Sequence, residues 1–219
     1  MNLVLYAYRY SAYSWMVRLV LAEKGVGFDY VEVNPFTEGR GPDHAVRQPF
    51  GRVPVLDHDG FVLYETVAIN HYLDETFAAP ALQPAGVAER ARMRQVMSVV
   101  DSYAYWPLVR QVFSHGFFRP VFGLPTDPAV YAEGLAAAPG VLAALDRLVA
   151  PDGYVAGPDL SLADVHLGPV IAYFTMVPEG AAMLARHPAL SRWWALMGRR
   201  PSLAATRPAY PGGPGATLG

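Results

Sequence analysis

Apolar residues recur with regular spacing along the first third of the chain, and this spacing predicts an alternation of strands and helices. Short apolar runs between turn residues predict strands, and apolar positions three or four residues apart predict helices. The expected strands are Leu3–Tyr8, Phe28–Val33, Val53–Asp57 and Phe61–Tyr64, and the expected helices are Ser14–Gly25 and Glu65–Phe77. This order is typical of a four-stranded mixed sheet covered by helices.

Turn-forming residues divide this region further. The stretch Asn34–Pro49 is rich in Gly and Pro, and we expect no long element there. The sequence His58-Asp59-Gly60 joins the last two expected strands and predicts a hairpin. The segment 80–86 lacks periodicity and contains Pro80 and Pro84, so we place a linker there, after an N-terminal domain of residues 1–79.

The second part of the chain carries only helical spacing. We expect an all-α helical bundle over residues 87–200, followed by an irregular Pro/Gly-rich tail at 201–219. A kink is expected at Pro107 and an interruption near Pro139 and Gly140. The expected helices are 87–118, 127–150, Ser161–Val177, Glu179–Arg186 and Ala189–Arg199.

Charge and composition narrow the function classes. The 17 basic and 19 acidic residues give a net charge of −2, so the chain lacks the basic surface that binds nucleic acid or an anionic membrane. No basic, apolar leader is found at the N-terminus, and no apolar run approaches the roughly 20 residues that span a bilayer. We therefore expect a cytoplasmic protein with a small-molecule or protein partner.

The chain has no cysteine, and its six histidines show no metal-ligand spacing. Disulfides, cysteine-based metal sites and mechanisms that use a protein thiol are therefore excluded. We expect no bound metal.

Three separated motifs carry a family resemblance. They are Tyr13–Leu19 with Glu23-Lys24-Gly25, Pro49–Leu56 with Tyr64-Glu65-Thr66, and Ser161–Asp164. In this order the sequence resembles the cytosolic glutathione S-transferase family, over nearly the whole chain up to about Arg200. The resemblance implies a thioredoxin-like α/β N-terminal domain that binds glutathione, a helical C-terminal domain that shapes the pocket for a second substrate, and a homodimer.

The second motif implies how glutathione is held. The family's proline at the position of Pro54 is cis and turns the main chain of Val53 towards the cysteinyl backbone of glutathione. Glu65 would face the ammonium group of the γ-glutamyl residue, and Thr66, where the family commonly has serine, would hold its carboxylate. Taken alone, Val53-Pro54 fits an ordinary trans proline at a strand edge, and Glu65-Thr66 fits the first turn of any helix.

The turn before the first helix is the expected place for the group that stabilises the glutathione thiolate. The tyrosine of the alpha, mu and pi classes would fall on Ala7, whereas the serine of the bacterial-type, theta-like and zeta-like enzymes falls on Ser11. We expect Ser11 to donate a hydrogen bond to the sulfur. Ser14 and Tyr13 are the alternatives, and Ser11 could instead be only a helix N-cap.

Further roles follow from the same resemblance. Arg40 and Arg52 would lie near the anionic end of glutathione, although both also fit solvated surface arginines, and the exposed Phe50 would insert into the partner subunit. The expected second-substrate pocket is lined by Tyr13, Tyr105, Trp106 and Phe113. On the long helix such aromatics also fit the core of a bundle.

Ser161 and Asp164 have the spacing of a helix capping box, a stabilising device whose loss would cost about 1 kcal/mol. The expected function is a glutathione S-transferase that attacks a hydrophobic electrophile with glutathione. The alternatives are a non-catalytic interaction module of the same fold and a glutathione-dependent isomerase or peroxidase.

Overall fold

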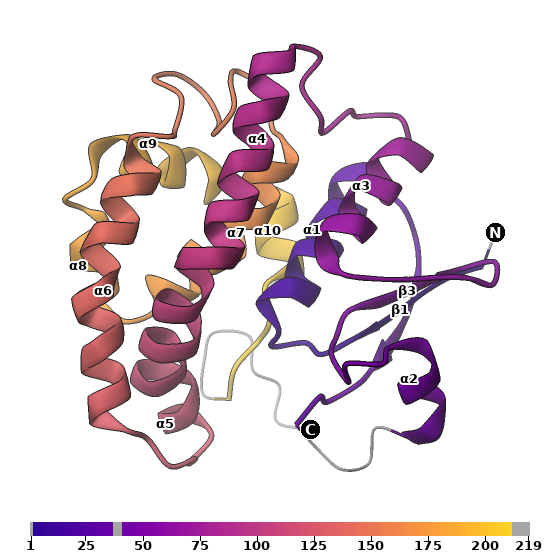
Figure 1. Cartoon of the computed structure of the whole chain (residues 1–219), viewed down its shortest axis with the longest axis horizontal. Coiled ribbons are helices and arrows are strands. Elements are labelled where there is room, and N and C mark those ends of the chain that lie inside the picture. The colour runs from indigo at the N-terminus through magenta and orange to yellow at the C-terminus, as the bar shows by residue number, and fades with distance from the viewer. Residues whose placement is uncertain (1, 37–40, 212–219) are drawn as a thin grey trace. The chain divides into compact units, whose positions relative to one another are not determined.

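The computed structural model describes residues 2–36 and 41–211. The chain divides into two compact units, Met1–Leu82 and Gln83–Gly219, which are drawn in Figure 1. The first unit carries every named strand, and the second carries helices.

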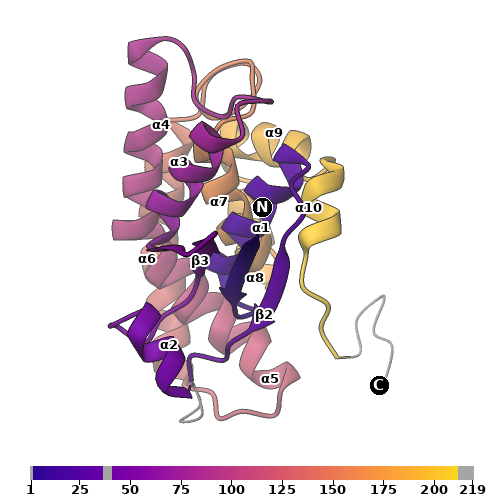
Figure 2. The ribbon, with the colours of Figure 1, turned by 90° about the vertical axis from the view of Figure 1, so that its right-hand side faces the viewer.

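The N-terminal unit contains the expected four-stranded mixed sheet, and its strand order is β2-β1-β3-β4. Its strands are β1 (Leu3–Ala7), β2 (Asp29–Glu32), β3 (Val55–His58) and β4 (Phe61–Tyr64). Strand β1 pairs parallel to β2 and antiparallel to β3, and β3 and β4 form the expected hairpin. Figure 2 shows β1 between β2 and β3.

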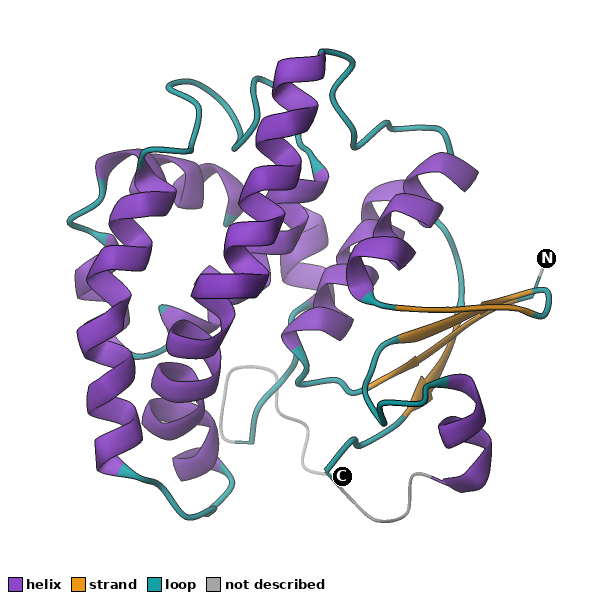
Figure 3. Ribbon diagram, in the orientation of Figure 1, coloured by secondary structure: helices purple, strands orange, loops and turns teal. Residues whose placement is uncertain are grey.

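Helices cover both faces of this sheet. Helix α1 (Ala12–Lys24) packs against α3 (Thr66–Thr76) on one side, and α2 (Gly41–Arg47) lies on the other (Figure 3). The ends of α1 and α3 are tied by a buried ion pair between Lys24 Nζ and Asp74 Oδ1 at 2.5 Å. The unit therefore has the thioredoxin-like arrangement that the family resemblance implies.

Helix α2 lies in the stretch where we expect no long element, and the sequence did not predict it. It has only seven residues, which is too short for an apolar stripe to repeat. Two polar side chains here are buried: His44 in the helix is 3% exposed, and Gln48, directly after the helix, is 2% exposed. The spacing of apolar residues does not predict a helix whose buried residues are polar.

In the described part of the second unit, up to residue 211, every named element is a helix, and an isolated bridge joins Tyr154 and Gly157. Helix α7 (Leu162–Phe174) lies at its centre, with every residue buried. The other helices are α4 (Val87–Val99), η1 (Val100–Phe118), α5 (Arg119–Val121), α6 (Pro128–Asp146), α8 (Pro178–Leu184), α9 (Pro188–Met197) and α10 (Pro201–Thr206). The all-α expectation for this part is confirmed.

Two expectations about proline need correction. Helix α6 is not interrupted at Pro139, which lies on its exposed side, where water can satisfy the backbone group that proline leaves unpaired. The kink expected at Pro107 stays a prediction, and Pro107 lies inside η1, which has π-type winding. Pro201 starts α10 because a missing N–H costs nothing in the first turn of a helix, so the irregular tail begins later than expected.

Helix α6 has another property that the sequence survey did not predict. It has 19 residues, and an 18-residue window of it has a mean hydropathy of 1.3, which makes it the one helix among those described that is long and apolar enough to cross a bilayer. Helices of soluble proteins meet the same criterion. Its buried residues, Gly134, Ala138, Leu142 and Leu145, lie at helical spacing.

Candidate functional site

The register of the sheet brings three chain segments to one edge. Tyr6 in β1 lies opposite Val55 in β3, and Val55 lies opposite Tyr64 in β4. Strands β1 and β4 therefore end where β3 begins. Three segments meet at this edge: the turn that leads to α1, the segment that precedes β3, and the start of α3. The topology therefore brings Ser11, Val53 and Glu65 to the same edge.

Ser11 is the N-cap of α1. Its hydroxyl oxygen accepts a hydrogen bond from the backbone amide of Ser14 at 3.3 Å, and its own amide donates to the carbonyl of Tyr8 at 2.9 Å. The side chain is half-buried, so it remains accessible. Because the cap uses a lone pair of the oxygen, the hydroxyl proton can still be donated elsewhere. The N-cap role and the predicted catalytic role are therefore compatible.

The two alternatives to Ser11 lie on the same helix. Ser14 is completely buried, and its hydroxyl oxygen accepts a hydrogen bond from the amide of Tyr8 at 3.3 Å. This bond connects the helix to the end of β1. Tyr13 is half-buried. A fully buried hydroxyl cannot meet a bound ligand without a change of packing, which favours Ser11 over Ser14 at this edge.

The segment before β3 has the backbone geometry that the resemblance implies. The Val53–Pro54 peptide bond is cis. Pro54 is buried, whereas Val53 is half-buried. The carbonyl of the preceding residue, Arg52, lies 3.0 Å from Nε2 of the buried His44. Sequence reasoning missed this histidine, although Gly41-Pro42-Asp43 is a recognisable helix start.

The start of α3 holds the predicted acidic and hydroxyl pair. Glu65 is the N-cap, is exposed, and has φ 72° and ψ 117°, a left-handed region that non-glycine residues seldom adopt. Thr66 is 6% exposed and is the first helical residue. Free backbone N–H groups and the positive end of the helix dipole favour an anion at this place.

Aromatic rings surround the turn that leads to Ser11. The ring centroid of Tyr8 lies 5.5 Å from that of Tyr10 and 6.0 Å from that of Phe36. Burial raises the pKa of Tyr8, with smaller contributions from Tyr10 and Glu32, so its phenol is neutral at physiological pH. Rings therefore lie beside this turn, together with the charged pair Arg9 and Glu32.

The arginines described near this edge differ in exposure and in contacts. Arg52 is exposed, as its predicted role in steering an anion requires. Arg40 lies outside the described residues. Arg47 of α2 stacks over the ring of Tyr6, with 4.6 Å between Cζ and the ring centroid. Sequence reasoning did not select Arg47, because neither its spacing nor its motif sets it apart from a surface arginine.

Phe50 lies in the loop between α2 and β3. Its side chain is 68% exposed, and its ring meets that of Tyr64 edge-on at a centroid distance of 6.2 Å. Water contact of an aromatic ring over most of its surface is unfavourable. An exposed Phe50 ring is what the predicted insertion into a partner subunit requires.

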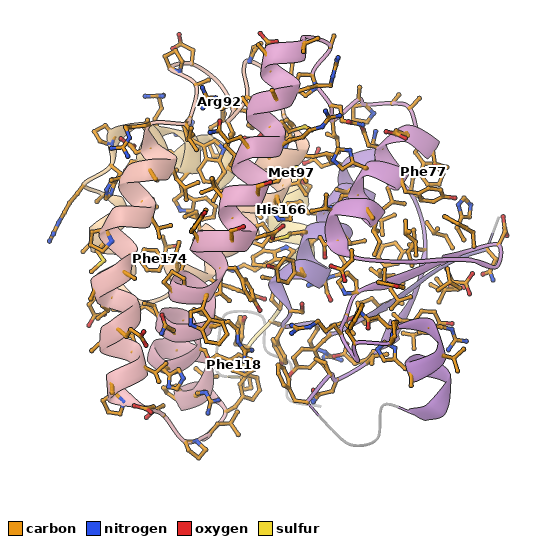
Figure 4. All side chains as sticks on the ribbon, in the orientation of Figure 1. Phe77, Arg92, Met97, Phe118, His166 and Phe174 are labelled. Carbon is orange, nitrogen blue, oxygen red and sulfur yellow. The ribbon has the colours of Figure 1, made fainter. Side chains whose placement is uncertain are left out.

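The aromatic residues expected to line a second pocket have different positions in the helical unit. Trp106 is 61% exposed and Tyr105 is half-buried. Phe113 is 3% exposed, and its ring stacks on Tyr173 with 4.2 Å between centroids and 3° between planes. It also lies 6.1 Å from Phe118, which Figure 4 labels. Phe113 thus belongs to the interior of this unit.

Asp164 is the centre of a buried network. Its carboxylate accepts hydrogen bonds from Ser161 N at 2.8 Å, Ser161 Oγ at 2.7 Å, Val155 N at 2.7 Å and Trp193 Nε1 at 2.7 Å. Burial raises the pKa of Asp164, while these donors oppose the rise. The carboxylate connects α7 to α9 and to the loop before α7, so it does more than cap a helix.

Among the described residues, no three imidazole or carboxylate side chains are grouped so that they could hold a metal ion. The buried His166 bonds through Nε2 to Asp101 Oδ1 at 2.8 Å (His166 is labelled in Figure 4). This pair connects α7 to η1 within the helical unit.

Two family models match the chain. Residues 1–75 match "Glutathione S-transferase, N-terminal domain", and residues 128–195 match "Glutathione S-transferase, C-terminal domain". The first match covers the whole sheet edge described above.

Relatives and solved structures agree with these matches. Glutathione S-transferase 3 of Zea mays is 30% identical over 199 residues, which cover 89% of this chain and 88% of the relative. The apo structure of glutathione S-transferase III superposes with a TM-score of 0.84 and 29% identity, covering 99% of this chain and 100% of that chain. Glutathione S-transferase-I bound with lactoylglutathione superposes with a TM-score of 0.82 and 27% identity, covering 94% of this chain and 99% of that chain.

Proposed function

Because the chain belongs to the cytosolic glutathione S-transferase family, we propose that Ser11 activates glutathione as a thiolate at the sheet edge of the N-terminal unit. The chain is a transferase that uses glutathione. The observation that carries the assignment to Ser11 is its place at the N-terminus of α1. There an accessible hydroxyl keeps its proton for donation while its oxygen caps the helix.

The chemistry needs a modest stabilisation. A thiol of the cysteine type has a pKa near ~8.5 and is mostly protonated at neutral pH. Lowering this value by about two units takes about 2.7 kcal/mol. One hydroxyl donor and the positive end of the helix dipole of α1 together supply energies of this order. Ser11 remains a hydrogen-bond donor and does not become a covalent nucleophile.

The rest of glutathione has partners along the same edge. The main chain of Val53, before the cis Pro54, pairs with the cysteinyl backbone in the manner of an added strand. The amides at the start of α3 and the hydroxyl of Thr66 hold the γ-glutamyl carboxylate, and Glu65 faces the ammonium group. Arg40 and Arg52 attract the remaining carboxylate.

The second substrate is a hydrophobic electrophile. Support comes from the rings of Tyr8, Tyr10 and Phe36 beside the turn that carries Ser11. Tyr13, a half-buried residue of α1 in the same unit, contributes further aromatic surface. A surface formed by such rings favours apolar, polarisable molecules over small anions. Conjugation of such compounds is a detoxification reaction, and we place it in the cytoplasm.

The enzyme acts as a homodimer. The 68% exposed ring of Phe50 is the observation that supports this assembly, because a partner subunit would remove it from water. A symmetric dimer uses the same contact twice, once in each direction.

The pH dependence of turnover tests the role of Ser11. In the wild type, kcat/KM for an aromatic electrophile should rise with a midpoint well below the pKa of free glutathione. Ser11→Ala should move the midpoint towards that of the free thiol and lower kcat/KM at neutral pH about a hundredfold. Ser11→Thr keeps a hydroxyl and is the matched control. An unchanged profile in Ser11→Ala would refute the assignment.

A further inference from the structure

Two buried polar side chains of the α2 region hold the loop that leads to Val53. Gln48 accepts a hydrogen bond from the amide of Phe50 through Oε1 at 2.6 Å, and its carbonyl accepts from the amide of Gly51 at 3.1 Å. His44 Nε2 lies 3.0 Å from the carbonyl oxygen of Arg52. Three consecutive residues of the loop are therefore each bonded to His44 or Gln48.

The bonds also connect to one another. The amide of Gln48 donates to the carbonyl of His44 at 2.9 Å, so the two residues form the last turn of α2 and its exit. Gly51 has φ 62°, which favours glycine, and lets the chain reverse between Phe50 and Arg52. These hydrogen bonds hold the last turn of α2 and its exit, His44 to Gln48, against the loop residues 50–52. We call this arrangement the corner.

The proton on His44 follows from the bond it makes. A carbonyl oxygen can only accept, so Nε2 must donate to Arg52, and the ring carries its proton on that nitrogen. At 3% exposure, the ring bonds this carbonyl with little competition from water. Within the parts of the chain that the structure describes, Nδ1 has no hydrogen-bond partner. Among the described residues, the hydrogen bond from Nε2 to the Arg52 carbonyl is thus the polar contact of the His44 ring.

From this arrangement we propose that His44 and Gln48 are positioning residues that set the main chain of Val53 for glutathione. The proposal rests on the proposed function, in which Val53 pairs with the tripeptide backbone. Backbone pairing requires an N–H and a C=O at fixed positions. Arg52 precedes Val53 directly, so holding the Arg52 carbonyl restricts the rotation of the peptide that bears the Val53 N–H.

This role differs from that of Ser11 in what it changes. His44 and Gln48 act on docking of the glutathione backbone, whereas Ser11 acts on the protonation of its sulfur. Loss of the corner should therefore weaken glutathione binding and leave the pKa of the bound thiol unaltered. Loss of the Ser11 hydroxyl should raise the pKa of the bound thiol and leave glutathione binding unaltered.

The test compares His44→Met, which fills the space without a donor, with His44→Gln, which keeps an N–H donor at a similar reach. Gln48→Met and Gln48→Glu form the second matched pair, because glutamate keeps an acceptor oxygen. Calorimetric titration gives the Kd for glutathione, and thiolate absorbance against pH at saturating glutathione gives the pKa of the bound thiol. Circular dichroism at the titration temperature reports the fold.

We expect His44→Met and Gln48→Met to raise Kd and KM for glutathione about tenfold, the equivalent of one neutral hydrogen bond. Turnover at saturation and the thiol pKa should stay at wild-type values, and His44→Gln should recover most of the affinity. A folded His44→Met protein with wild-type Kd would overturn the proposal. Loss of the fold in this variant would also overturn it, because the residue would then act on stability alone.

Failure of the proposed function would look different. A wild-type protein that binds glutathione without forming thiolate would contradict the role of Ser11. The comparison of Kd between His44→Met and His44→Gln would still decide whether the corner positions Val53.

Discussion

The hydroxyl oxygen of Ser11 accepts its hydrogen bond from the amide of Ser14, while the hydroxyl oxygen of Ser14 accepts one from the amide of Tyr8. The two serines thus connect the first turn of α1 to the end of β1. One hydroxyl is accessible and the other is buried. This division assigns direct contact with a ligand to Ser11 and support of the turn to Ser14.

Ser14→Ala should have a smaller effect than Ser11→Ala. It removes the bond from the Tyr8 amide but keeps the Ser14 amide that donates to the Ser11 hydroxyl, so kcat/KM should fall about three- to tenfold, as for the loss of one neutral hydrogen bond. Steady-state kinetics with Ser14→Thr as the control measure this. A loss as large as that of Ser11→Ala would indicate that Ser14 itself reaches the sulfur.

Glu65→Gln should weaken glutathione binding. The substitution keeps the size of the side chain and removes the charge that faces the ammonium group, so KM for glutathione should rise about tenfold with little change in kcat. Thr66→Val should act in the same direction, and Thr66→Ser, which restores the hydroxyl, should not. If Glu65→Gln lowered kcat alone, the charge would act on the chemical step instead of on binding.

Phe50→Ala should weaken the dimer. The substitution removes an exposed ring that a partner would bury, so sedimentation velocity should show a shift towards monomer at micromolar concentration. Phe61→Ala is a suitable control, because Phe61 is also exposed, at 53%, but lies on β4. Equal behaviour of the two variants would contradict a specific role for Phe50.

Asp164→Asn should destabilise the helical unit by about 3 kcal/mol, more than the loss of a helix cap. The amide nitrogen that replaces one carboxylate oxygen donates and cannot accept hydrogen bonds, so at least one buried donor is left without a partner. Ser161→Ala removes only a hydroxyl and should cost about 1 kcal/mol. Urea denaturation of both variants gives the comparison, and equal losses would mean that Asp164 is only a cap.

The strands and the hairpin could be predicted from the sequence because their signals are local. Alternation of apolar residues sets the register, and Asp59-Gly60 takes the positive φ values of a tight turn, 51° and 89°. Once the order of strands is known, the gathering of Ser11, Val53 and Glu65 at one edge follows from antiparallel pairing. The cis bond at Pro54 required the family resemblance, because proline alone does not specify it.

Other features could not be predicted because they depend on contacts between distant residues. His44 and Gln48 are polar and buried, a combination that only a matching backbone can explain. Phe113 and Trp106 have the same aromatic signal in sequence, yet one stacks on Tyr173 and the other is exposed. Helical spacing alone did not separate them.

The measurement that tests the account most directly is the ultraviolet absorbance of the glutathione thiolate on binding at neutral pH. The wild-type protein should produce this absorbance, and Ser11→Ala should bind glutathione with similar Kd and produce little or none. A wild-type complex that lacks the thiolate signal, or an Ser11→Ala complex that retains it in full, would contradict the central claim.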